Sequence, residues 1–316
     1  MLANDRLQPE MSAAEEHVVV TGGCGFIGRA VVRGYLATGH RVTVVDRVPS
    51  PEPGVESLVG DLADAGLRDR VIREDVSGIV HLAAATSVLG SMRDPLGTFE
   101  DNVAVTAALI DLARARGVGR FLMSSTNAVV GEVGERLINE DFPLRPLTAY
   151  GATKAAAEMI LSGYAGSYEI ATCALRFTNV YGPGMGHKDS LVARLMRAAR
   201  ANRRVQIYGD GTQRRDFVHV DDVVAAVLLA WQHPVGTLII GSGQSPTVLE
   251  LVERVEAVTE RKLPVDYVAP RQGEMSAVIV DITRARELGF RPVMELDEGL
   301  GSAWEDAQAR WADEPG

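Results

Sequence analysis

The stretch from His17 to Asp46, HVVVTGGCGFIGRAVVRGYLATGHRVTVVD, decides the fold. It opens with a β-branched run, His17 to Gly23, which predicts a buried strand that enters a tight turn. Gly28 to Gly39 has the spacing of a helix, and Arg41 to Asp46 is a second β-branched run. A strand, a helix and a second strand in this order predict a βαβ unit with parallel strands and a right-handed crossover.

The same alternation continues along the first half of the chain. Continuous apolar runs at 78–85 and 120–126 are bounded by glycine or polar turns, as expected of strands that are covered on both faces. Between them, residues 104–117 have helical spacing and end on a glycine. The sequence therefore predicts an α/β fold built on a doubly wound parallel sheet.

The pattern loosens after about Thr178, where glycine and proline become frequent and a strand such as 205–208 is short. Leu238 to Gly241 is expected to return to the main sheet, and the rest to form a smaller α/β lobe over the carboxyl edge of the strands, where such sheets bind ligands. The predicted organisation is a loose N-terminal extension at 1–16, a cofactor-binding domain at 17–177 plus about 215–241, a substrate-binding lobe at 178–214 and 242–306, and a C-terminal tail at 307–316.

Composition excludes several classes of function. The 316 residues are 46% hydrophobic and carry a net charge of −10, which argues against nucleic acid as a partner. Two cysteines far apart in the chain predict neither a disulfide framework nor a metal site. We find no signal peptide and no apolar run long enough to cross a membrane, so a cytoplasmic protein with no membrane partner is expected.

The glycine-rich turn after the first strand predicts a dinucleotide site. Gly22, Gly25 and Gly28 let the backbone approach a pyrophosphate, and the helix that follows offers free N–H groups. Asp46 ends the second strand, where a carboxylate accepts hydrogen bonds from ribose hydroxyls and repels a 2′-phosphate, which favours NAD over NADP. The alternative is a structural turn with a surface aspartate.

A second element is Tyr150-Gly-Ala-Thr-Lys154. Tyrosine and lysine four residues apart share one face of a helix. An adjacent ammonium is expected to lower the pKa of the phenol and make it a usable base. Chance occurrence is the alternative, but SST at Ser124 to Thr126 ends a predicted strand between this motif and the glycine turn.

Five motifs together resemble one family. TGGCGFIG, SST, YGATK, LRFTNVYGPG and RRDFVHVDD occur in the order found in the extended short-chain dehydrogenase/reductases (the NAD-dependent epimerase/dehydratase family), and the likeness is greatest to the UDP-glucose 4-epimerase-like branch. The resemblance spans about residues 17–305 and implies a Rossmann domain. It implies that Tyr150 is the catalytic base, that Lys154 is its helper and NAD anchor, and that Thr126 hydrogen-bonds the reacting sugar hydroxyl, with Ser125 beside it.

The reaction that this resemblance implies is an epimerisation at carbon 4 of a nucleotide-linked sugar. Tyr150 takes the hydroxyl proton while hydride passes to NAD, and hydride returns to the other face of the 4-keto sugar after it rotates. Asp61 contacts the adenine or caps the following helix, and Asn102 faces the cofactor or caps an internal loop. The residues expected to bind NAD are Gly22, Gly25, Phe26, Ile27, Gly28, Asp46, Asp61, Leu62, Ala83, Ala84, Asn102, Tyr150 and Lys154.

The family also implies contacts to the nucleotide sugar. Asn179 matches an asparagine on the diphosphate, and Arg215 and Arg271 match an arginine pair that clamps it. Glu274 matches an acidic residue on the nucleotide ribose, and Gln206 lies near the expected base pocket. The full expected set is Ser125, Thr126, Asn179, Leu191, Gln206, Arg215, Arg271 and Glu274, for a UDP-sugar in the first place and a dTDP-sugar as the alternative.

Departures from sister enzymes narrow the chemistry. Asn127 and Ala128 stand where 4,6-dehydratases carry an Asp–Glu pair and where decarboxylases carry a Glu, so elimination and decarboxylation lack their acid and base. Asn179 in place of a threonine disfavours a glucuronate substrate. Val130 replaces an aromatic residue expected to wall the site, and Val278 replaces a tyrosine, which leaves room for an N-acetyl group.

Three further expectations complete the reading. A 4-ketoreductase is the second enzymatic hypothesis, and Asp46 argues against the NADPH that such enzymes use. A non-catalytic NAD-binding regulator is the hypothesis from another class, and Thr126, Tyr150 and Lys154 together argue against it. A homodimer through apolar faces of residues 104–116 and 153–165 is the family habit.

Overall fold

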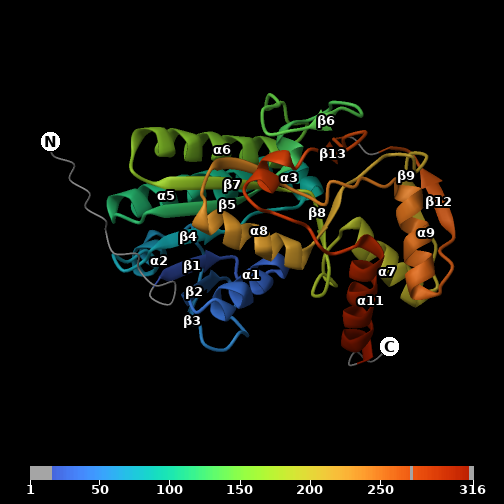
Figure 1. Cartoon of the computed structure of the whole chain (residues 1–316), viewed down its shortest axis with the longest axis horizontal. Coiled ribbons are helices and arrows are strands. Elements are labelled where there is room, and N and C mark those ends of the chain that lie inside the picture. The colour runs from blue at the N-terminus through green and yellow to red at the C-terminus, as the bar shows by residue number, and fades with distance from the viewer. Residues whose placement is uncertain (1–15, 271–272, 313–316) are drawn as a thin grey trace.

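The computed structural model of the chain describes residues 16–270 and 273–312. Its centre is a sheet of seven parallel strands in the order β11-β7-β5-β4-β1-β2-β3 (Figure 1). The strand order reverses between β1 and β4, which is the point where open α/β sheets bind ligands. The strands are β1 (His17–Thr21), β2 (Arg41–Asp46), β3 (Glu56–Val59), β4 (Gly78–His81), β5 (Arg120–Thr126), β7 (Ala171–Phe177) and β11 (Gly236–Ile240).

Helices cover both faces of this sheet because successive strand side chains point to opposite sides. Val18 and Val20 pack under α1 (Phe26–Ala37) and α8 (Val220–Gln232), whereas Val19 faces the other layer. That second layer contains α2 (Ala65–Val71), α5 (Val105–Ala115) and α6 (Ala149–Ser167). Figure 1 shows α5 and α6 on one side of the sheet and α1 with α8 on the other.

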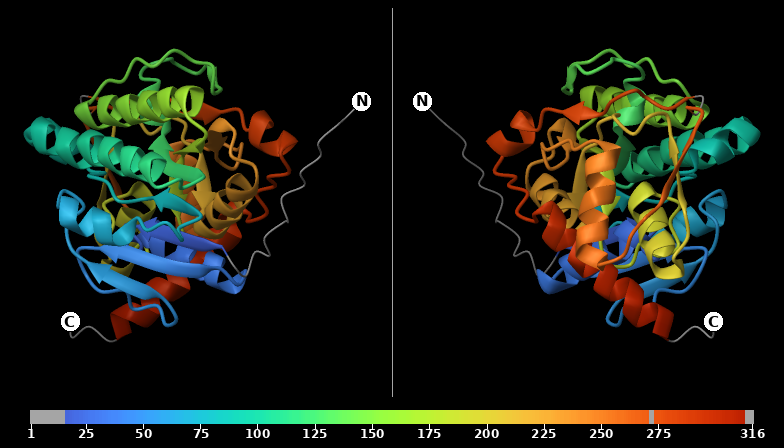
Figure 2. Two further views of the ribbon diagram at one scale, coloured as in Figure 1. Left: turned by 90° about the vertical axis from the view of Figure 1, so that its left-hand side faces the viewer. Right: turned by 90° about the vertical axis from the view of Figure 1, so that its right-hand side faces the viewer.

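The smaller lobe joins segments that are distant in sequence. Each of its two-stranded sheets is parallel: β8 (Asn179–Tyr181) pairs with β10 (Phe217–His219), and β9 (Val205–Tyr208) pairs with β12 (Val265–Val268). Its helices α7, α9 and α11 share a hydrophobic core, and the right-hand view of Figure 2 shows α9 beside α7. These helices are α7 (Leu191–Ala201), α9 (Val248–Thr259) and α11 (Leu296–Ala312).

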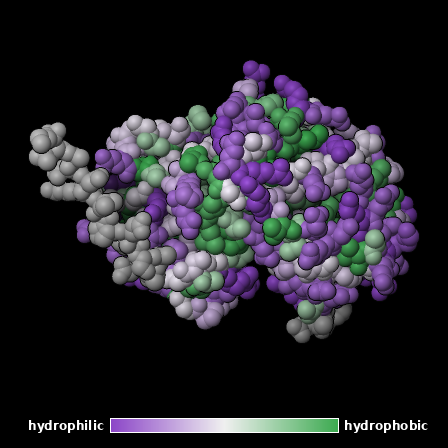
Figure 3. Space-filling model, in the orientation of Figure 1, coloured by the Kyte–Doolittle hydropathy of each residue, from purple (hydrophilic) through white to green (hydrophobic). Residues whose placement is uncertain are grey.

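The remaining elements are short and lie between the two halves or on the sheet's outer layer. A third parallel pair joins residues near 137 to residues near 279. Figure 3 shows a notch in the lower edge of the molecule, between the strand half and the lobe. The short elements are α3 (Val88–Arg93), α4 (Pro95–Phe99), the π-helix η2 (Glu100–Ala104), the 3₁₀ turn η3 (Asn127–Val129), β6 (Leu137–Ile138), β13 (Ile279–Val280) and α10 (Thr283–Glu287).

The fold class, the strand runs and the return of β11 to the sheet are confirmed, but several boundaries are wrong. The run at 78–85 leaves the sheet after His81: the Leu82 N–H makes a last bond to β1, at 3.1 Å from the Thr21 carbonyl, and residues 82–87 form no strand. The helix expected at 104–117 is α-helical only over 105–115 and is preceded by a π-helix at 100–104, and α1 begins two residues before Gly28.

The two expected loose ends are shorter than predicted. Residues 307–312 continue α11, and Ala307 is buried against the lobe. Glu16 is anchored: its carboxylate accepts bonds from Arg120 at 2.5 Å and from the Trp231 indole at 2.7 Å. Residues 1–15 and 313–316, the rest of the predicted extension and tail, lie outside the described residues.

Candidate active site

The candidate site lies where the parallel strands end. Residues from the turn after β1, from the carboxyl ends of β2, β4 and β5, and from the first two turns of α6 meet at this edge. Parallel strands carry their functional residues to one edge of the sheet, so residues more than 100 positions apart in sequence come together here.

The glycine turn is a close-packed backbone cradle. A side-chain carbon on Gly28 would lie 2.1 Å from the Gly22 carbonyl oxygen, and one on Gly22 would lie 2.6 Å from the Ala83 nitrogen. Gly22 also has a positive φ of 68°, which favours glycine. Gly25 precedes the first helical residue and leaves the N-terminus of α1 free for an anion. These features fit a dinucleotide pyrophosphate.

Asp46 is fixed beside this cradle. One carboxylate oxygen accepts the backbone N–H of Cys24 at 2.9 Å, and the other accepts that of Arg47 at 2.7 Å. The Arg47 side chain pairs with Asp61 at 3.0 Å and with Asp101 at 3.5 Å. Asp46 is therefore placed to receive a ribose, and the neighbouring arginine is already bound to carboxylates.

The expectation that Asp61 caps α2 is wrong. Asp64 is the N-cap, and its side chain accepts the Gly66 N–H at 2.8 Å. Asp61 instead accepts the Ala63 N–H at 2.9 Å in a local turn and stays exposed. Its position at the end of β3 leaves the adenine contact as a prediction.

Asn102 holds the backbone that follows β4. Its amide accepts from the Ala85 N–H at 2.8 Å, and donates to the Ala85 carbonyl and to Thr153 Oγ1, both at 3.0 Å. Asn102 is thus the internal loop cap, and it fastens the segment containing Ala83 and Ala84 to helix α6. Both alanines are half-buried at the edge of the site.

The other expected cofactor residues are mostly packed inside. Phe26 lies in the hydrophobic core of the lobe, and the Leu62 side chain lies in the core under α2, so both face away from the site. Ile27 is half-buried in the first turn of α1. Contacts of Phe26 and Leu62 to a cofactor would come from the backbone.

Thr126, Tyr150 and Lys154 converge as expected. Thr126 ends β5, and its hydroxyl is hydrogen-bonded to the Tyr150 phenol. Thr148 caps α6 through the Gly151 N–H at 3.2 Å, and the Tyr150 N–H donates to Ser91 Oγ at 3.1 Å. Lys154 follows one turn later, buried, and donates to the Ser124 carbonyl at 2.9 Å.

The expected effect of Lys154 on the phenol is not what the structure shows. Burial raises the pKa of Tyr150 to about 12, and the hydrogen bond from Thr126 opposes this only in part. Burial likewise lowers the pKa of Lys154 to about 8, against the raising effect of Glu158. The ammonium is directed at the Ser124 carbonyl and is itself short of solvent, so it does not make the phenol acidic here.

The prediction that Ser125 lies beside the reacting sugar is wrong. Strand alternation turns its side chain to the opposite side of β5 from Ser124 and Thr126. It is buried, and its hydroxyl donates to Glu158 Oε1 at 2.5 Å on the α6 side of the sheet. Ser125 therefore touches neither the reacting group nor a sugar.

On the substrate side, Asp216 organises the expected contacts. This buried carboxylate accepts from Thr178 Oγ1 at 2.7 Å and from Ser242 and Gly243 N–H groups at 2.9 and 2.8 Å. Its backbone carbonyl accepts from Asn179 Nδ2 at 2.8 Å. Burial raises the pKa of Asp216, while these bonds lower it.

Arg215 lies next to the loop that carries Glu274. Its guanidinium donates to the Met275 carbonyl at 2.6 Å and the Ser276 carbonyl at 3.2 Å. Burial lowers the pKa of Arg215, whereas Glu274 and Glu132 raise it. Gly273 packs against Thr148 at the start of α6, which brings this loop to the site.

The remaining substrate residues are spread over the lobe. Glu274 is exposed, Gln206 is exposed on the face of β9 opposite Val205 and Ile207, and Leu191 is half-buried at the first position of α7. Arg271 lies outside the described residues.

The residues that depart from the sister enzymes lie in different places relative to the site. Asn127 is buried and its Nδ2 lies 3.5 Å from the Phe177 carbonyl, and Ala128 donates its N–H to Thr126 at 3.2 Å. Val130 packs into the core, so replacing an aromatic residue there removes no wall of the site. Val278 is 9% exposed and bridges to Arg215, beside the substrate contacts.

Comparison with known proteins identifies the family. The profile of the NAD dependent epimerase/dehydratase family matches residues 18–241. The chain belongs to this family. A putative UDP-glucose 4-epimerase of Methanocaldococcus jannaschii is 30% identical over 90% of this chain and 95% of its own length. A dTDP-glucose 4,6-dehydratase of Streptomyces griseus is 33% identical, over 93% and 95%.

Solved structures of this family superpose over nearly the whole chain. MoeE5, solved with UDP-glucuronic acid and NAD and with UDP-glucose and NAD, is 36% identical with a TM-score of 0.88, over 93% of this chain and 99% of that one. A UDP-N-acetylglucosamine 4-epimerase of Methanobrevibacter ruminantium is 28% identical with a TM-score of 0.88, over 94% and 99%. As a member of this NAD-dependent epimerase/dehydratase family, the chain is an enzyme that uses NAD.

Two groups of buried polar residues near the site were missed from the sequence. His81, in the apolar run of β4, accepts from Thr21 Oγ1 at 2.7 Å and lies 3.1 Å from Thr106, whose hydroxyl donates to the Asn102 carbonyl. Burial lowers the pKa of His81 to about 3, with a smaller effect of Lys154, so the ring is neutral. The sequence could have indicated His81, because it is a polar residue in an otherwise apolar strand.

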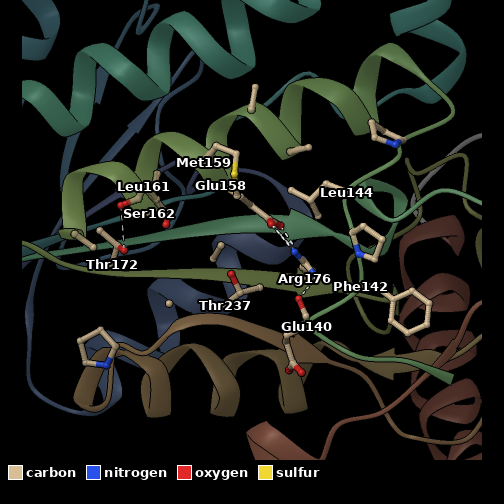
Figure 4. A pocket seen from close by; sticks show the side chains of 18 of the residues that line it. Glu140, Phe142, Leu144, Glu158, Met159, Leu161, Ser162, Thr172, Arg176 and Thr237 are labelled. Atoms are coloured by element: carbon tan, nitrogen blue, oxygen red, sulfur yellow. Dashed lines mark hydrogen bonds and ion pairs between the residues drawn. The ribbon is translucent and has the colours of Figure 1, made fainter. Parts of the chain in front are cut away.

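The second missed group is Glu158 with Arg176. A cavity of about 780 Å³ lies behind α6, over β7 and β11, and these two side chains point at each other in it (Figure 4). Thr126, Tyr150 and Lys154 are not among the residues that line it, so this cavity is separate from the catalytic edge. The sequence could have indicated Glu158 through its spacing, because it follows Lys154 by one helical turn.

Two classes of site receive no support in the part of the chain that is described. None of its helices is long and apolar enough to span a bilayer. Its His, Cys, Asp and Glu side chains form no group of three or more suited to hold a metal ion.

Proposed function

We propose that this enzyme is an NAD-dependent UDP-sugar 4-epimerase that acts through a transient 4-keto sugar. The convergence of Thr126, Tyr150 and Lys154 at the carboxyl edge, beside the glycine cradle, carries the proposal. The relatives and solved structures that act on UDP-sugars at carbon 4 support it.

The residues of this chain divide the work. Thr126 and Tyr150 share a hydrogen bond, so a sugar hydroxyl that replaces it meets both groups, and Tyr150 holds or returns the proton. Lys154 has three N–H donors, and Ser124 takes one, which leaves two for a cofactor ribose. Gly22, Gly28 and Asp46 would hold NAD, which when bound supplies the hydride acceptor and donor.

Burial raises the pKa of Tyr150 to about 12, which is too high for a base at neutral pH. Tyr150 is therefore protonated in the protein by itself. A positive charge near the phenol would lower this pKa. Bound, oxidised NAD would supply such a positive charge.

Elimination lacks its machinery although a dehydratase is among the relatives. Thr126 is followed by Asn127, which does not titrate, and by Ala128, which carries no polar side chain. These positions favour simple epimerisation over dehydration and decarboxylation.

The sugar pairs that we propose are UDP-Glc/Gal and UDP-GlcNAc/GalNAc. Val278 supports the second pair, because it is small and bridges to Arg215. The exclusion of glucuronate stays a prediction from Asn179, and MoeE5, which was solved with UDP-glucuronic acid, makes that sugar a necessary comparison.

The test is an assay without added cofactor. The purified protein is incubated with each member of the two pairs and with UDP-glucuronate, and the sugars are followed by NMR. Interconversion with no net change in cofactor absorbance supports the epimerase. Stoichiometric oxidation or reduction of cofactor without interconversion would support a 4-ketoreductase instead.

We further propose a homodimer, with an interface shifted from the predicted one. In the helical layer that contains α5 and α6, the large exposed apolar side chains are on α3, α4 and α6 rather than on α5. They are Leu89, Met92, Leu96, Phe99 and Met159. Light scattering of the wild type and of Leu96→Asp/Phe99→Asp tests this, and the variant is expected to be monomeric.

A further inference from the structure

Three ionisable side chains follow one another along α6. Tyr150, Lys154 and Glu158 are spaced by four residues, so they lie on one side of the helix in successive turns. Lys154 and Glu158 are each only 3% exposed. A carboxylate this deeply buried needs partners, and the mechanism above assigns it no role.

The partners of Glu158 come from two neighbouring strands. Arg176 on β7 binds it side-on, with Nε at 3.0 Å from Oε1 and Nη2 at 2.7 Å from Oε2. Ser125 on β5 donates to Oε1 at 2.5 Å. Figure 4 shows the Glu158 and Arg176 side chains meeting between α6 and the sheet.

The bond from Ser125 falls between two functional residues of β5. Ser124, one residue before, offers its carbonyl to Lys154 at 2.9 Å. Thr126, one residue after, is hydrogen-bonded to Tyr150. Strand β5 and helix α6 are therefore joined by three consecutive rungs, Thr126–Tyr150, Ser124–Lys154 and Ser125–Glu158.

We propose that Glu158 is a positioning residue of the active site: it fixes the end of β5 against α6 through Ser125, and it supplies the negative charge that faces the Lys154 ammonium. Arg176 holds the carboxylate in place from β7. This inference rests on the roles proposed for Tyr150 and Lys154. Glu158 itself touches no substrate.

The charges around Lys154 agree with this role. Burial lowers the pKa of Lys154, and Glu158 is the charge that raises it again. On α6, Tyr150 is protonated, and on β4, His81 is neutral because burial lowers its pKa to about 3. On β7, Arg176 is paired with Glu158 at 2.7 Å. Without Glu158, the cationic form of Lys154 loses its counter-charge.

The composition of the chain permits a direct test. Lys154, Lys188 and Lys262 are its only lysines, so protein labelled with ¹³C at lysine Cε gives three assignable NMR signals, with Lys188→Arg and Lys262→Arg for assignment. The measurement is a pH titration of the NAD-bound protein. It reports the protonation of Lys154 without requiring turnover.

The decisive variant is Glu158→Gln/Arg176→Gln, which removes both charges and keeps hydrogen-bonding side chains. Removing one member alone would leave a buried charge unpaired and endanger folding. We expect the Lys154 signal to titrate about 0.5 to 1 pH unit lower than in the wild type. The alkaline limb of kcat is expected to move in the same direction.

Two controls separate positioning from general damage. Ser125→Ala breaks the rung and keeps the ion pair, so kcat should fall about 3- to 10-fold while the Lys154 titration stays in place. Glu56→Gln/Arg73→Gln removes a charge pair on the exposed edge of the sheet and should change neither readout.

A Lys154 signal that titrates at the wild-type pH in the folded Gln–Gln variant overturns the electrostatic role. An unchanged kcat in Ser125→Ala overturns the rung. If Tyr150→Phe retained activity, the proposed function would fail, yet the NMR titration would still report whether Glu158 faces Lys154.

Discussion

The residues proposed to bind NAD and those proposed to bind the sugar nucleotide are held in different ways. On the NAD side, functional groups are fixed by one another: Asp46 binds the Cys24 N–H, and Asn102 binds Ala85 and Thr153. On the sugar side, Gln206 and Glu274 are exposed, and Arg215 is held by backbone carbonyls of a surface loop.

The fold therefore holds the proposed NAD-binding groups in place and leaves the proposed sugar-binding side chains free to vary. A turn whose side chains are already held by hydrogen bonds binds a cofactor with little reorganisation, which would suit the proposed recycling of bound NAD. A lobe whose contacts are carried by exposed side chains can change its sugar without disturbing that cradle. Four experiments can break or sharpen this comparison.

The largest effect is expected at Tyr150, which lies at the boundary of the two sides. Tyr150→Phe removes the proton acceptor and should lower kcat on the order of 10³-fold. NAD should remain bound, since the substitution changes neither the glycine turn nor Lys154. The measurement is kcat together with the NAD content of the purified variant, and loss of NAD would show that the two sides are not separate.

A second test damages the cradle alone. In Gly28→Ala the added carbon would lie 2.1 Å from the Gly22 carbonyl oxygen, so the turn must shift. NAD binding should weaken by on the order of 100-fold, measured by calorimetry on stripped protein. Gly163→Ala is the matched control, because its added carbon meets nothing within 4 Å on α6, and it should leave NAD binding unchanged.

A third test damages the sugar side alone. Arg215→Ala removes a guanidinium expected on the diphosphate and should raise KM for the nucleotide sugar about 10- to 100-fold. NAD content should not change. Arg204→Ala, which loses an exposed ion pair with Asp266 and a bond to the Val265 carbonyl, should keep the wild-type KM.

The smallest effect concerns His81 and stability. Its pKa is lowered to about 3, so the unfolded state, with an ordinary histidine pKa, takes up the proton first as pH falls. The stability that depends on neutral His81 is complete above about pH 6.5 and is lost as pH falls towards 3.

Chemical denaturation at pH 6.5 and pH 5 measures this loss. His81 should account for up to about 2 kcal/mol of the decrease in the free energy of unfolding over that interval. His81→Asn cannot protonate, so its decrease should be smaller by that amount. The exposed His233→Gln should behave like the wild type, and an equal decrease in His81→Asn would show that His81 is not the group responsible.

Sequence reasoning was most successful where local pattern and function coincide. The β-branched runs, the glycine turn and the Tyr150–Lys154 spacing each describe one element, and neighbours far away in the chain do not alter them. Ser125 shows the limit: its neighbours Ser124 and Thr126 face the site, and only the pleat of β5 shows that it faces Glu158. The pKa of Tyr150 shows a second limit. Burial raises this pKa, and the burial of one side chain depends on the whole fold.

The order of the chain has a consequence for how the protein is made. Gly22, Asp46, Asn102 and Lys154 all precede residue 155, whereas each parallel pair of the lobe is completed by a later segment, the last at Val265–Val268. At about 5 to 20 residues per second, a ribosome needs roughly 8 to 30 s to complete the chain after Lys154. The ribosome therefore completes the segment that contains these proposed NAD-binding residues well before it completes the lobe.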